Sequence, residues 1–319
     1  MIQDPKALYF SPSGGTGFGM SLFMECKEAY RLRYIEGIEA AEPNIHQLFG
    51  RACHKIPECY WKGLPQEKAF DEALKVCGEL GPPMLLPSKI RDKWLSLMDG
   101  LMESVEAYYE FHKDDFGYSD NNHEQVHMLE QEFQCQLVVD DIKYDEQCRR
   151  IYYPQIFVTG RIDQYIGTTL RELKTASEVG ANWKTDYRNY LLRNWGIQVY
   201  DWYLCNWLTG TAMESSKYSA PENIEVEVLV KPYRDKRPRM ELFDITKEMV
   251  SYRERTVQQV EWICREMAEY HLRNSMVSPW PMSSSACTTK FGPCDYLVGC
   301  NQGHEKAAEK GLYKIRVKV

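Results

Sequence analysis

Three side chains in the middle of the sequence are of the types that bind a divalent cation and activate water. Glu172 follows Asp163 by nine positions, and Lys174 comes two positions later. Carboxylate oxygens bind Mg²⁺ or Mn²⁺, and such a cation can hold a phosphate oxygen and lower the pKa of a bound water. A lysine beside that water can orient it, or accept its proton if the amine is partly desolvated. The alternative is that Glu172 and Lys174 form a solvated ion pair.

Alternating apolar and polar residues predict the strands that would carry these side chains. The ranges 155–166 and 169–175 are typical of two strands joined by a turn at Gly167. Residues two positions apart on a strand point to the same face, so Glu172 and Lys174 should project together. Two further strands are predicted at 129–139 and 223–231. In the first of these, Glu130 falls on the polar face, opposite the apolar face that Leu129 begins.

Helical periodicity surrounds these strands. Apolar residues recur at helical spacing over about 20–35, 45–60, 66–77, 87–109, 187–208 and 246–272. Helices and strands in this order predict a mixed α/β fold with a central sheet. No long linker divides the 319 residues, so we expect a single domain. Its parts would be a helical layer at about 20–112, a catalytic α/β core at about 128–272 and a cysteine-bearing tail at about 283–303.

The composition excludes several classes of protein. With 44% hydrophobic and 27% charged residues, the chain is neither fibrous nor wholly disordered. A net charge of -7 argues against wholesale wrapping of nucleic acid but allows a local basic groove. The sequence has no run of about 18 apolar residues and no basic segment leading into an apolar stretch. We therefore expect an intracellular, cytoplasmic protein that does not span a membrane.

Cysteine is frequent, with 11 residues, and three of them lie close together near the C-terminus. Cys287, Cys294 and Cys300 are spaced more widely than the short knuckles of zinc fingers. A reducing compartment favours metal or cluster ligation over disulfides. A 4Fe-4S cluster needs four thiolates, and this tail offers three. Zinc binding and simple burial of the thiols are the alternatives.

Residues His123 to His127 form a literal HEXXH sequence, the signature of zinc metallopeptidases, in which Glu124 would activate the water. Glu146 lies where some such enzymes place a third ligand. The chemistry requires a helix, so that His123 and His127 share one face. The strand predicted from 129 leaves little room for that helix. A zinc metallopeptidase is therefore kept as an alternative function.

The densest basic stretch runs from Lys231 to Arg239 and is predicted to be a loop after a strand. Basic loops with interleaved aromatic residues suit backbone contacts and base stacking on single-stranded nucleic acid. A solvated charged loop is an equally good interpretation. The sequence therefore assigns no individual nucleic-acid contact.

Taken together, the motifs resemble the PD-(D/E)XK nuclease superfamily. Asp163 with Glu172-Leu173-Lys174 matches its metal and lysine signature, although Ile162 replaces the proline of the classical Pro-Asp pair. More narrowly, the chain looks like the RecB-like branch, which includes AddB-type and CRISPR-adaptation nucleases with an iron-sulfur cluster. The resemblance implies a restriction-endonuclease-like fold.

Three further features carry the narrower resemblance. Gly50 to His54 is similar to a GxxxH motif whose histidine adds a metal ligand, whereas a lone helical histidine is more often structural. Gln198 resembles the start of a QxxxY motif, but Trp202 stands at its fourth position, and Tyr200 and Tyr203 lie nearby. Cys26 matches the position of the fourth cluster ligand, so that the two ends of the chain would be joined.

The resemblance implies a metal-dependent DNA nuclease that leaves a 5′ phosphate and a 3′ hydroxyl. His54, Asp163, Glu172 and the carbonyl of Leu173 would hold Mg²⁺ or Mn²⁺, with Mn²⁺ favoured by the imidazole nitrogen. Lys174 would position or deprotonate the water, and Gln198 would support the site. The substrate would be single-stranded or end-bearing DNA in recombination, repair or replication, with a helicase or recombination partner, and the enzyme could be phage-encoded. A non-catalytic nucleic-acid-binding module is a second alternative.

Overall fold

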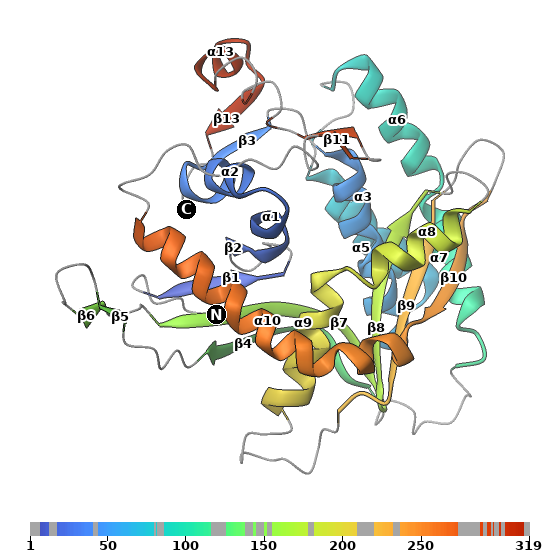
Figure 1. The fold of residues 1–319 in the computed structure, drawn as a ribbon. Coiled ribbons are helices and arrows are strands. Elements are labelled where there is room, and N and C mark those ends of the chain that lie inside the picture. Colours follow the sequence, from blue (N-terminus) through green and yellow to red (C-terminus); the bar gives the residue numbers. More distant parts are fainter. Residues whose placement is uncertain are drawn as a thin grey trace. The chain divides into compact units, whose positions relative to one another are not determined.

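The computed structural model describes a mixed α/β fold in which helices flank a mixed sheet (Figure 1). The described residues are 7–12, 18–40, 44–79, 81, 86–115, 126–137, 143–144, 150–151, 155–177, 182–208, 220–231, 237–273, 288–289, 292–294, 296, 300 and 304–315. The chain forms two compact units. Unit 1 comprises Met1–Pro43, Glu132–Gly160 and Glu254–Val319, and unit 2 comprises Asn44–Gln131 and Arg161–Arg253.

The sheet of unit 2 has the strand order β10-β9-β8-β7. Its strands are β7 (Ile156–Ile166), β8 (Thr169–Ala176), β9 (Asn223–Val230) and β10 (Arg239–Asp244). β7 and β8 form an antiparallel hairpin, β8 and β9 are parallel, and β9 and β10 are antiparallel. Gly167 has a φ of 56°, the left-handed conformation that glycine adopts without strain. The three strands predicted here are thus confirmed, whereas β10 was missed because a loop was expected before it.

A helical layer covers one face of this sheet. It consists of α3 (Ile45–Cys53), α4 (Lys55–Trp61), α5 (Gln66–Gly78), α6 (Ser88–Asp99) and α7 (Leu101–Phe111). Apolar side chains of these helices form one buried cluster with Leu173 of β8 and Leu229 of β9. Two of the predicted continuous helices are broken, at His54 and at Gly100. Gly100 is a residue of low helix propensity, which explains the second break.

The long helix expected at 187–208 is also divided, into α8 (Trp183–Leu191) and α9 (Trp195–Tyr203), followed by a π-helix at Leu204–Leu208. Asn194 has extended backbone angles, and its side chain accepts a hydrogen bond from the N–H of Gly196 at 2.9 Å. An asparagine in this position caps the N-terminus of a new helix. The local capping interaction therefore outweighs the continuous helical pattern.

Strand β4 (Val126–Leu137) begins earlier than the sequence pattern predicts and pairs with β7. Glu130 within it has a φ of 49°, a left-handed conformation that is uncommon for a residue other than glycine. The buried residues change from the even position of Met128 to the odd positions of Phe133 and Cys135. The expected face of Glu130 was therefore wrong, because simple alternation does not continue through this residue.

Unit 1 is built from segments that are distant in the sequence. β1 (Leu8–Ser11) pairs in parallel with β7 and with β2 (Phe18–Gly19). The helix expected over 20–35 is interrupted at Cys26, giving α1 (Met20–Glu25), α2 (Lys27–Tyr30) and a π-helix at Arg31–Ile35. The later part of α10 (Thr246–Arg273) joins this unit. The Tyr30 hydroxyl lies 2.5 Å from Nε2 of His271 on α10.

The remaining described elements are short. β13 (Tyr313–Ile315) pairs antiparallel with β3 (Ile38–Ala40), so an early and a late segment of the chain lie together in unit 1. The other short elements are β5 (Lys143–Tyr144), β6 (Arg150–Ile151), β11 (Thr288–Thr289), β12 (Gly292–Pro293) and α13 (His304–Glu309). Among the described helices, none has the length and apolar content needed to cross a membrane.

Candidate active site

The hairpin of β7 and β8 brings together the three residues that the sequence singled out. Gln164 pairs with Arg171, so Asp163 stands opposite Glu172 on the other face of the sheet. Oδ2 of Asp163 accepts a hydrogen bond from the backbone N–H of Leu173 at 2.9 Å. The Lys174 ammonium forms an ion pair with Glu172. Two carboxylates and one ammonium therefore share a small volume at the hairpin.

Two more side chains reach this group from other elements of unit 2. Nδ1 of His54, the residue between α3 and α4, lies 3.3 Å from Oδ2 of Asp163 and 3.4 Å from Oε1 of Glu130. One potential ligand atom from each of these three residues lies within 4.8 Å of the others. One imidazole and two carboxylates at this spacing can hold a divalent cation.

Glu130 is the member of this group that the sequence analysis did not assign to the site. Its left-handed backbone lies in strand β4, and Oε2 accepts from Nε of Arg161 at 2.9 Å. Strained backbone of this kind tends to occur at functional sites. Little in the sequence indicated this role for Glu130. The buried face changes from even to odd positions between Met128 and Phe133, and this change is visible only once burial is known.

The site contains two carboxylates with opposite pKa shifts. Burial raises the pKa of Glu172, the neighbouring Asp163 adds to this effect, and the value reaches about 7 despite Lys174. Burial also acts to raise the pKa of Asp163, but His54 and Lys174 outweigh it and hold the pKa below its usual range. Burial acts to lower the pKa of His54, but the carboxylates of Asp163 and Glu130 raise it to about 10. Paired groups with divergent pKa values are typical of functional sites.

Lys174 stays positively charged in this environment. Burial acts to lower its pKa, but Glu172 and Asp163 outweigh burial and raise it above the usual lysine value. Tyr200 of α9 also lies within electrostatic reach of Glu172. Burial raises the pKa of its phenol, and the negative charge of Glu172 raises it further. The Tyr200 hydroxyl therefore stays neutral within electrostatic reach of the ion pair.

Gln198 lies on the same helix as Tyr200 but takes part in a local interaction. Its Nε2 donates to the carbonyl oxygen of Leu192 at 2.9 Å, across the connection between α8 and α9. This bond fixes the start of α9, which carries Tyr200. Of the aromatic residues that follow Gln198, Tyr200 is the one with an electrostatic interaction with Glu172 and Lys174.

Unsatisfied polar atoms provide a test of whether a cation fits this site. Among the described residues, Nδ1 of His54, Oε1 of Glu130 and Oε2 of Glu172 are buried and have no hydrogen-bond partner. Leaving such atoms buried and unpaired costs free energy, on the order of 1–3 kcal/mol each. A divalent cation bound by His54, Glu130 and Asp163 would satisfy the first two of these atoms, so this donor set fits Mg²⁺ or Mn²⁺.

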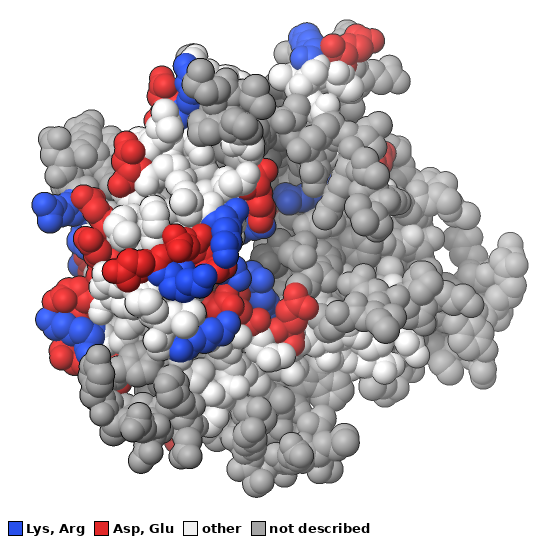
Figure 2. Space-filling view, turned by 180° about the vertical axis from the view of Figure 1, so that it is seen from behind, with Lys and Arg blue, Asp and Glu red and all other residues white. Residues whose placement is uncertain are grey.

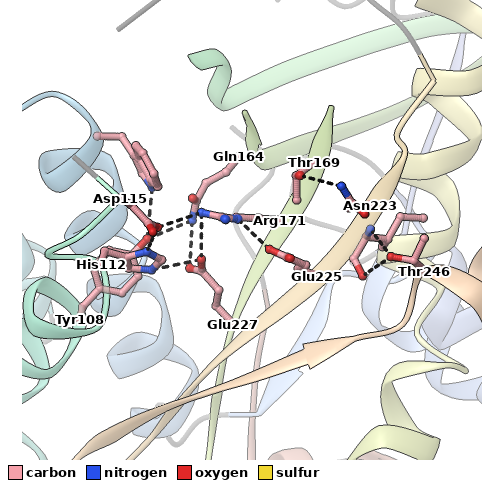
Figure 3. Close-up of polar contacts among 12 residues, drawn as sticks. Tyr108, His112, Asp115, Gln164, Thr169, Arg171, Asn223, Glu225, Glu227 and Thr246 are labelled. Carbon is pink, nitrogen blue, oxygen red and sulfur yellow. Dashed lines mark hydrogen bonds and ion pairs between the residues drawn. The ribbon is translucent and has the colours of Figure 1, made fainter. Parts of the chain in front are cut away.

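A second polar network lies on the opposite face of the same hairpin (Figure 3). His112 is buried between two carboxylates, with Nδ1 2.7 Å from Asp115 and Nε2 3.2 Å from Glu227. Arg171 contacts Asp115 at 3.5 Å and Glu225 at 2.9 Å. Burial acts to lower the pKa of His112, but Glu227 and Asp115 outweigh burial and raise it. The imidazolium form therefore compensates buried negative charge.

This network is joined to the site through the strands themselves. Gln164 directly follows Asp163, and Arg171 directly precedes Glu172, so the two sets of side chains alternate between the faces. Nε2 of Gln164 donates to Glu227 at 3.5 Å. The network thus fixes the pairing of the two strands that carry the carboxylates.

Several described basic side chains are partly neutralised by ion pairs with carboxylates. Lys184 and Arg239 both contact Glu241, at 2.6 and 3.1 Å, and Arg188 contacts Glu248 at 2.7 Å. Residues 232–236 of the basic stretch lie outside the described part of the chain. On the face shown in Figure 2, described basic and acidic side chains lie intermixed rather than in a patch of one sign.

The cysteines proposed as ligands gather in unit 1. Cys26 is buried with Ala29, Leu32 and Tyr296, and Cys294 and Cys300 pack against this cluster. Cys26 has extended backbone angles between α1 and α2. The fourth residue, Cys287, lies outside the described residues. The other described cysteines, Cys53, Cys59, Cys77, Cys135, Cys205 and Cys264, are buried or half-buried.

The HEXXH sequence is described only at its end. His127 lies in strand β4 and packs against Tyr165 at 5.5 Å between ring centres. A strand at this histidine does not provide the helical spacing that the zinc chemistry requires. His123, Glu124 and Glu146 lie outside the described residues.

Comparison with known proteins gives one family match. The model of the PD-(D/E)XK nuclease superfamily matches residues 19–300, which include all of unit 2, part of unit 1 and all the residues of the candidate site. No curated protein matches the chain.

Proposed function

Because the chain belongs to the PD-(D/E)XK nuclease superfamily, we propose that it is a metal-dependent DNA nuclease whose site is the group around Asp163. The observation that carries this proposal is the convergence of His54, Glu130 and Asp163 within 4.8 Å, beside the Glu172–Lys174 ion pair. A single-domain organisation and the RecB-like branch remain predictions.

The metal would be held by His54, Glu130 and Asp163, with Glu172 and the Leu173 carbonyl as further ligands expected from the motif. When bound, Mg²⁺ or Mn²⁺ supplies Lewis acidity and lowers the pKa of a bound water. A nitrogen among oxygen ligands favours Mn²⁺ over Mg²⁺. The Leu173 N–H holds Asp163 in its orientation through the 2.9 Å hydrogen bond. This contact limits the movement of the ligand and thereby preorganises the site.

Lys174 would orient the attacking water and stabilise the negative charge that develops on the phosphate. Its raised pKa supports this role over that of a general base, since the ammonium stays protonated at neutral pH. Glu172 keeps the ammonium in place through the ion pair. Gln198 would act indirectly, by fixing the start of α9 through its bond to Leu192.

We further propose that Cys26, Cys287, Cys294 and Cys300 bind a 4Fe-4S cluster, with zinc as the alternative occupant. The supporting observation is that Cys26 and the half-buried Cys294 and Cys300 belong to one cluster of side chains. The pairing of β3 with β13 brings the corresponding early and late segments together. Such a cluster would close a long loop and stabilise unit 1.

The substrate is proposed to be single-stranded DNA or DNA with free ends, in recombination, repair or replication. The family match supports DNA as the substrate. The strand preference, the phage source and a helicase or recombination partner rest on the narrower resemblance.

The decisive experiment measures cleavage of end-labelled single-stranded and duplex DNA in Mn²⁺. Glu172→Gln and Lys174→Met should abolish cleavage, while Asp71→Asn, on the exposed side of α5, should keep it. Glu124→Gln should also retain nuclease activity, and loss of a peptidase activity in that variant would favour the metallopeptidase alternative. Wild-type protein that binds nucleic acid but cuts no form of DNA or RNA would contradict the proposal.

A further inference from the structure

Lys231, which directly follows β9, is a buried lysine with no carboxylate partner among the residues that the structure describes. It is 9% exposed, and its backbone N–H donates to the carbonyl of Ala176 at 2.8 Å, beside the end of β8. Among the described residues, no carboxylate contacts its ammonium. Burial lowers the pKa of Lys231 and outweighs the opposing effect of the neighbouring Cys53 thiol. A buried charge that is left uncompensated is costly, so an external anion would stabilise it.

His46 lies within electrostatic reach of two lysines, Lys231 and Lys93. His46 is in the first turn of α3, and Lys93 is on α6, while α3 packs against both α6 and β8. Burial lowers the pKa of His46, and the positive charges of Lys231 and Lys93 lower it further. Lys231 and Lys93, from two other elements, therefore both lie within electrostatic reach of His46 at the N-terminal end of α3.

Within the described part of the chain, no acidic side chain pairs with His46, Lys93 or Lys231. The first turn of α3 contains no acidic residue. Asp92, which precedes Lys93, contacts Arg91 at 3.9 Å. The backbone N–H groups of a helix N-terminus add to the positive potential. The surroundings are therefore suited to an anion.

We propose that His46, Lys93 and Lys231 form a binding site for a backbone phosphate of the nucleic-acid substrate, away from the bond that is cut. This inference rests on the proposed nuclease function. α3 connects the two sites, because His46 lies in its first turn and His54 directly after its last. Eight residues of helix span about 12 Å. A short run of nucleotides covers this distance, so one strand could contact both sites. The long stem of Lys231 can remain buried while its ammonium contacts the phosphate.

The test measures affinity for a fluorescein-labelled single-stranded 20-mer in Ca²⁺, which replaces Mn²⁺ to prevent cleavage, over a range of salt concentrations. Lys231→Met keeps the apolar stem and removes the charge. It should weaken binding roughly 5-fold at about 0.1 M salt and reduce the slope of log K against log salt by about 0.7, the value for one phosphate contact on a single strand. Lys93→Met, at an exposed position, should act in the same direction. The matched control is Lys75→Met, since Lys75 is exposed and already pairs with Glu72 at 2.7 Å.

Thermal unfolding separates a binding role from a structural one. Lys231→Met should not lower the melting temperature, because it removes an uncompensated buried charge. Salt slopes of both Lys231→Met and Lys93→Met equal to those of the wild type would overturn the phosphate site, even if the protein cuts DNA. Wild-type protein that neither binds nor cuts the oligonucleotide would overturn the proposed function as well.

Discussion

The carboxylate of Asp163 accepts a hydrogen bond from the backbone N–H of Leu173 at 2.9 Å. Leu173 lies between Glu172 and Lys174, so this contact ties one strand of the hairpin to the motif on the other. The hydrogen bond orients Asp163 with one oxygen while His54 lies 3.3 Å from the same atom. The geometry of the candidate metal site thus depends on an interaction of the main chain.

Two substitutions of Asp163 should separate the effect of its negative charge from the effect of its hydrogen bond to Leu173. Asp163→Asn keeps an acceptor for the Leu173 N–H but removes the negative charge, so the fold should persist while cleavage falls by at least about 100-fold. Asp163→Ala removes both the charge and the hydrogen-bond acceptor. This variant should be as inactive as Asp163→Asn and also less stable. Cleavage rates in Mn²⁺ and urea unfolding measure the two effects. Activity of Asp163→Asn within about 3-fold of wild type would contradict the assigned role.

Glu130 should contribute to metal affinity although no motif identified it. Its Oε1 is buried without a hydrogen-bond partner among the described residues, and His54 lies 3.4 Å away. Glu130→Gln should weaken Mn²⁺ binding about 10- to 100-fold, measured by calorimetric titration of the apoprotein. Asp71→Asn, on the exposed surface of α5, is the control. An unchanged Mn²⁺ affinity in Glu130→Gln would remove this residue from the site.

His112 should make stability depend on pH. Glu227 and Asp115 raise its folded-state pKa, in spite of burial, above the unfolded value of about 6.5. The contribution to stability is therefore fully present below the unfolded pKa, and it is lost as the pH rises through the folded pKa. His112→Gln removes one of two charged partners of the buried Glu227 and leaves Arg171 at 3.8 Å as the other, at a cost of up to about 3 kcal/mol at low pH.

The measurement for His112 is urea unfolding of the wild type and His112→Gln across this pH range. The difference in unfolding free energy should be largest at the acidic end and should shrink as the pH rises, while other titrating groups cancel between the two proteins. Lys113→Gln, next in the sequence and exposed, should show no such trend. A difference that is constant with pH would show that His112 is not the titrating group.

The cysteine cluster should be visible in the anaerobically purified protein. A 4Fe-4S cluster would give an absorption shoulder at about 400 nm with iron and sulfide in proportion. Cys26→Ser should abolish the shoulder and lower the stability of the protein. Cys59→Ser replaces a buried thiol of α4 and should leave the absorption intact. Colourless protein with stoichiometric zinc would instead support the alternative occupant.

The sequence by itself determined the hairpin and the residues that it brings together. Alternation predicted β7 and β8, Gly167 marked the turn, and the spacing of Glu172 and Lys174 placed them on one face. These features depend on local periodicity and on a glycine that tolerates positive φ, and both can be read from neighbouring residues.

The tertiary structure decided which other side chains complete the site. Glu130 enters it through a left-handed backbone in β4, a conformation that no residue pattern prescribes. His54 reaches Asp163 because α3 ends there and packs on the sheet, and Gln198 turns to Leu192 instead. These positions depend on packing between segments far apart in the chain. Local periodicity determines the face of a helix or strand on which a side chain lies. Which other residues contact that face is determined only by the packing of the elements.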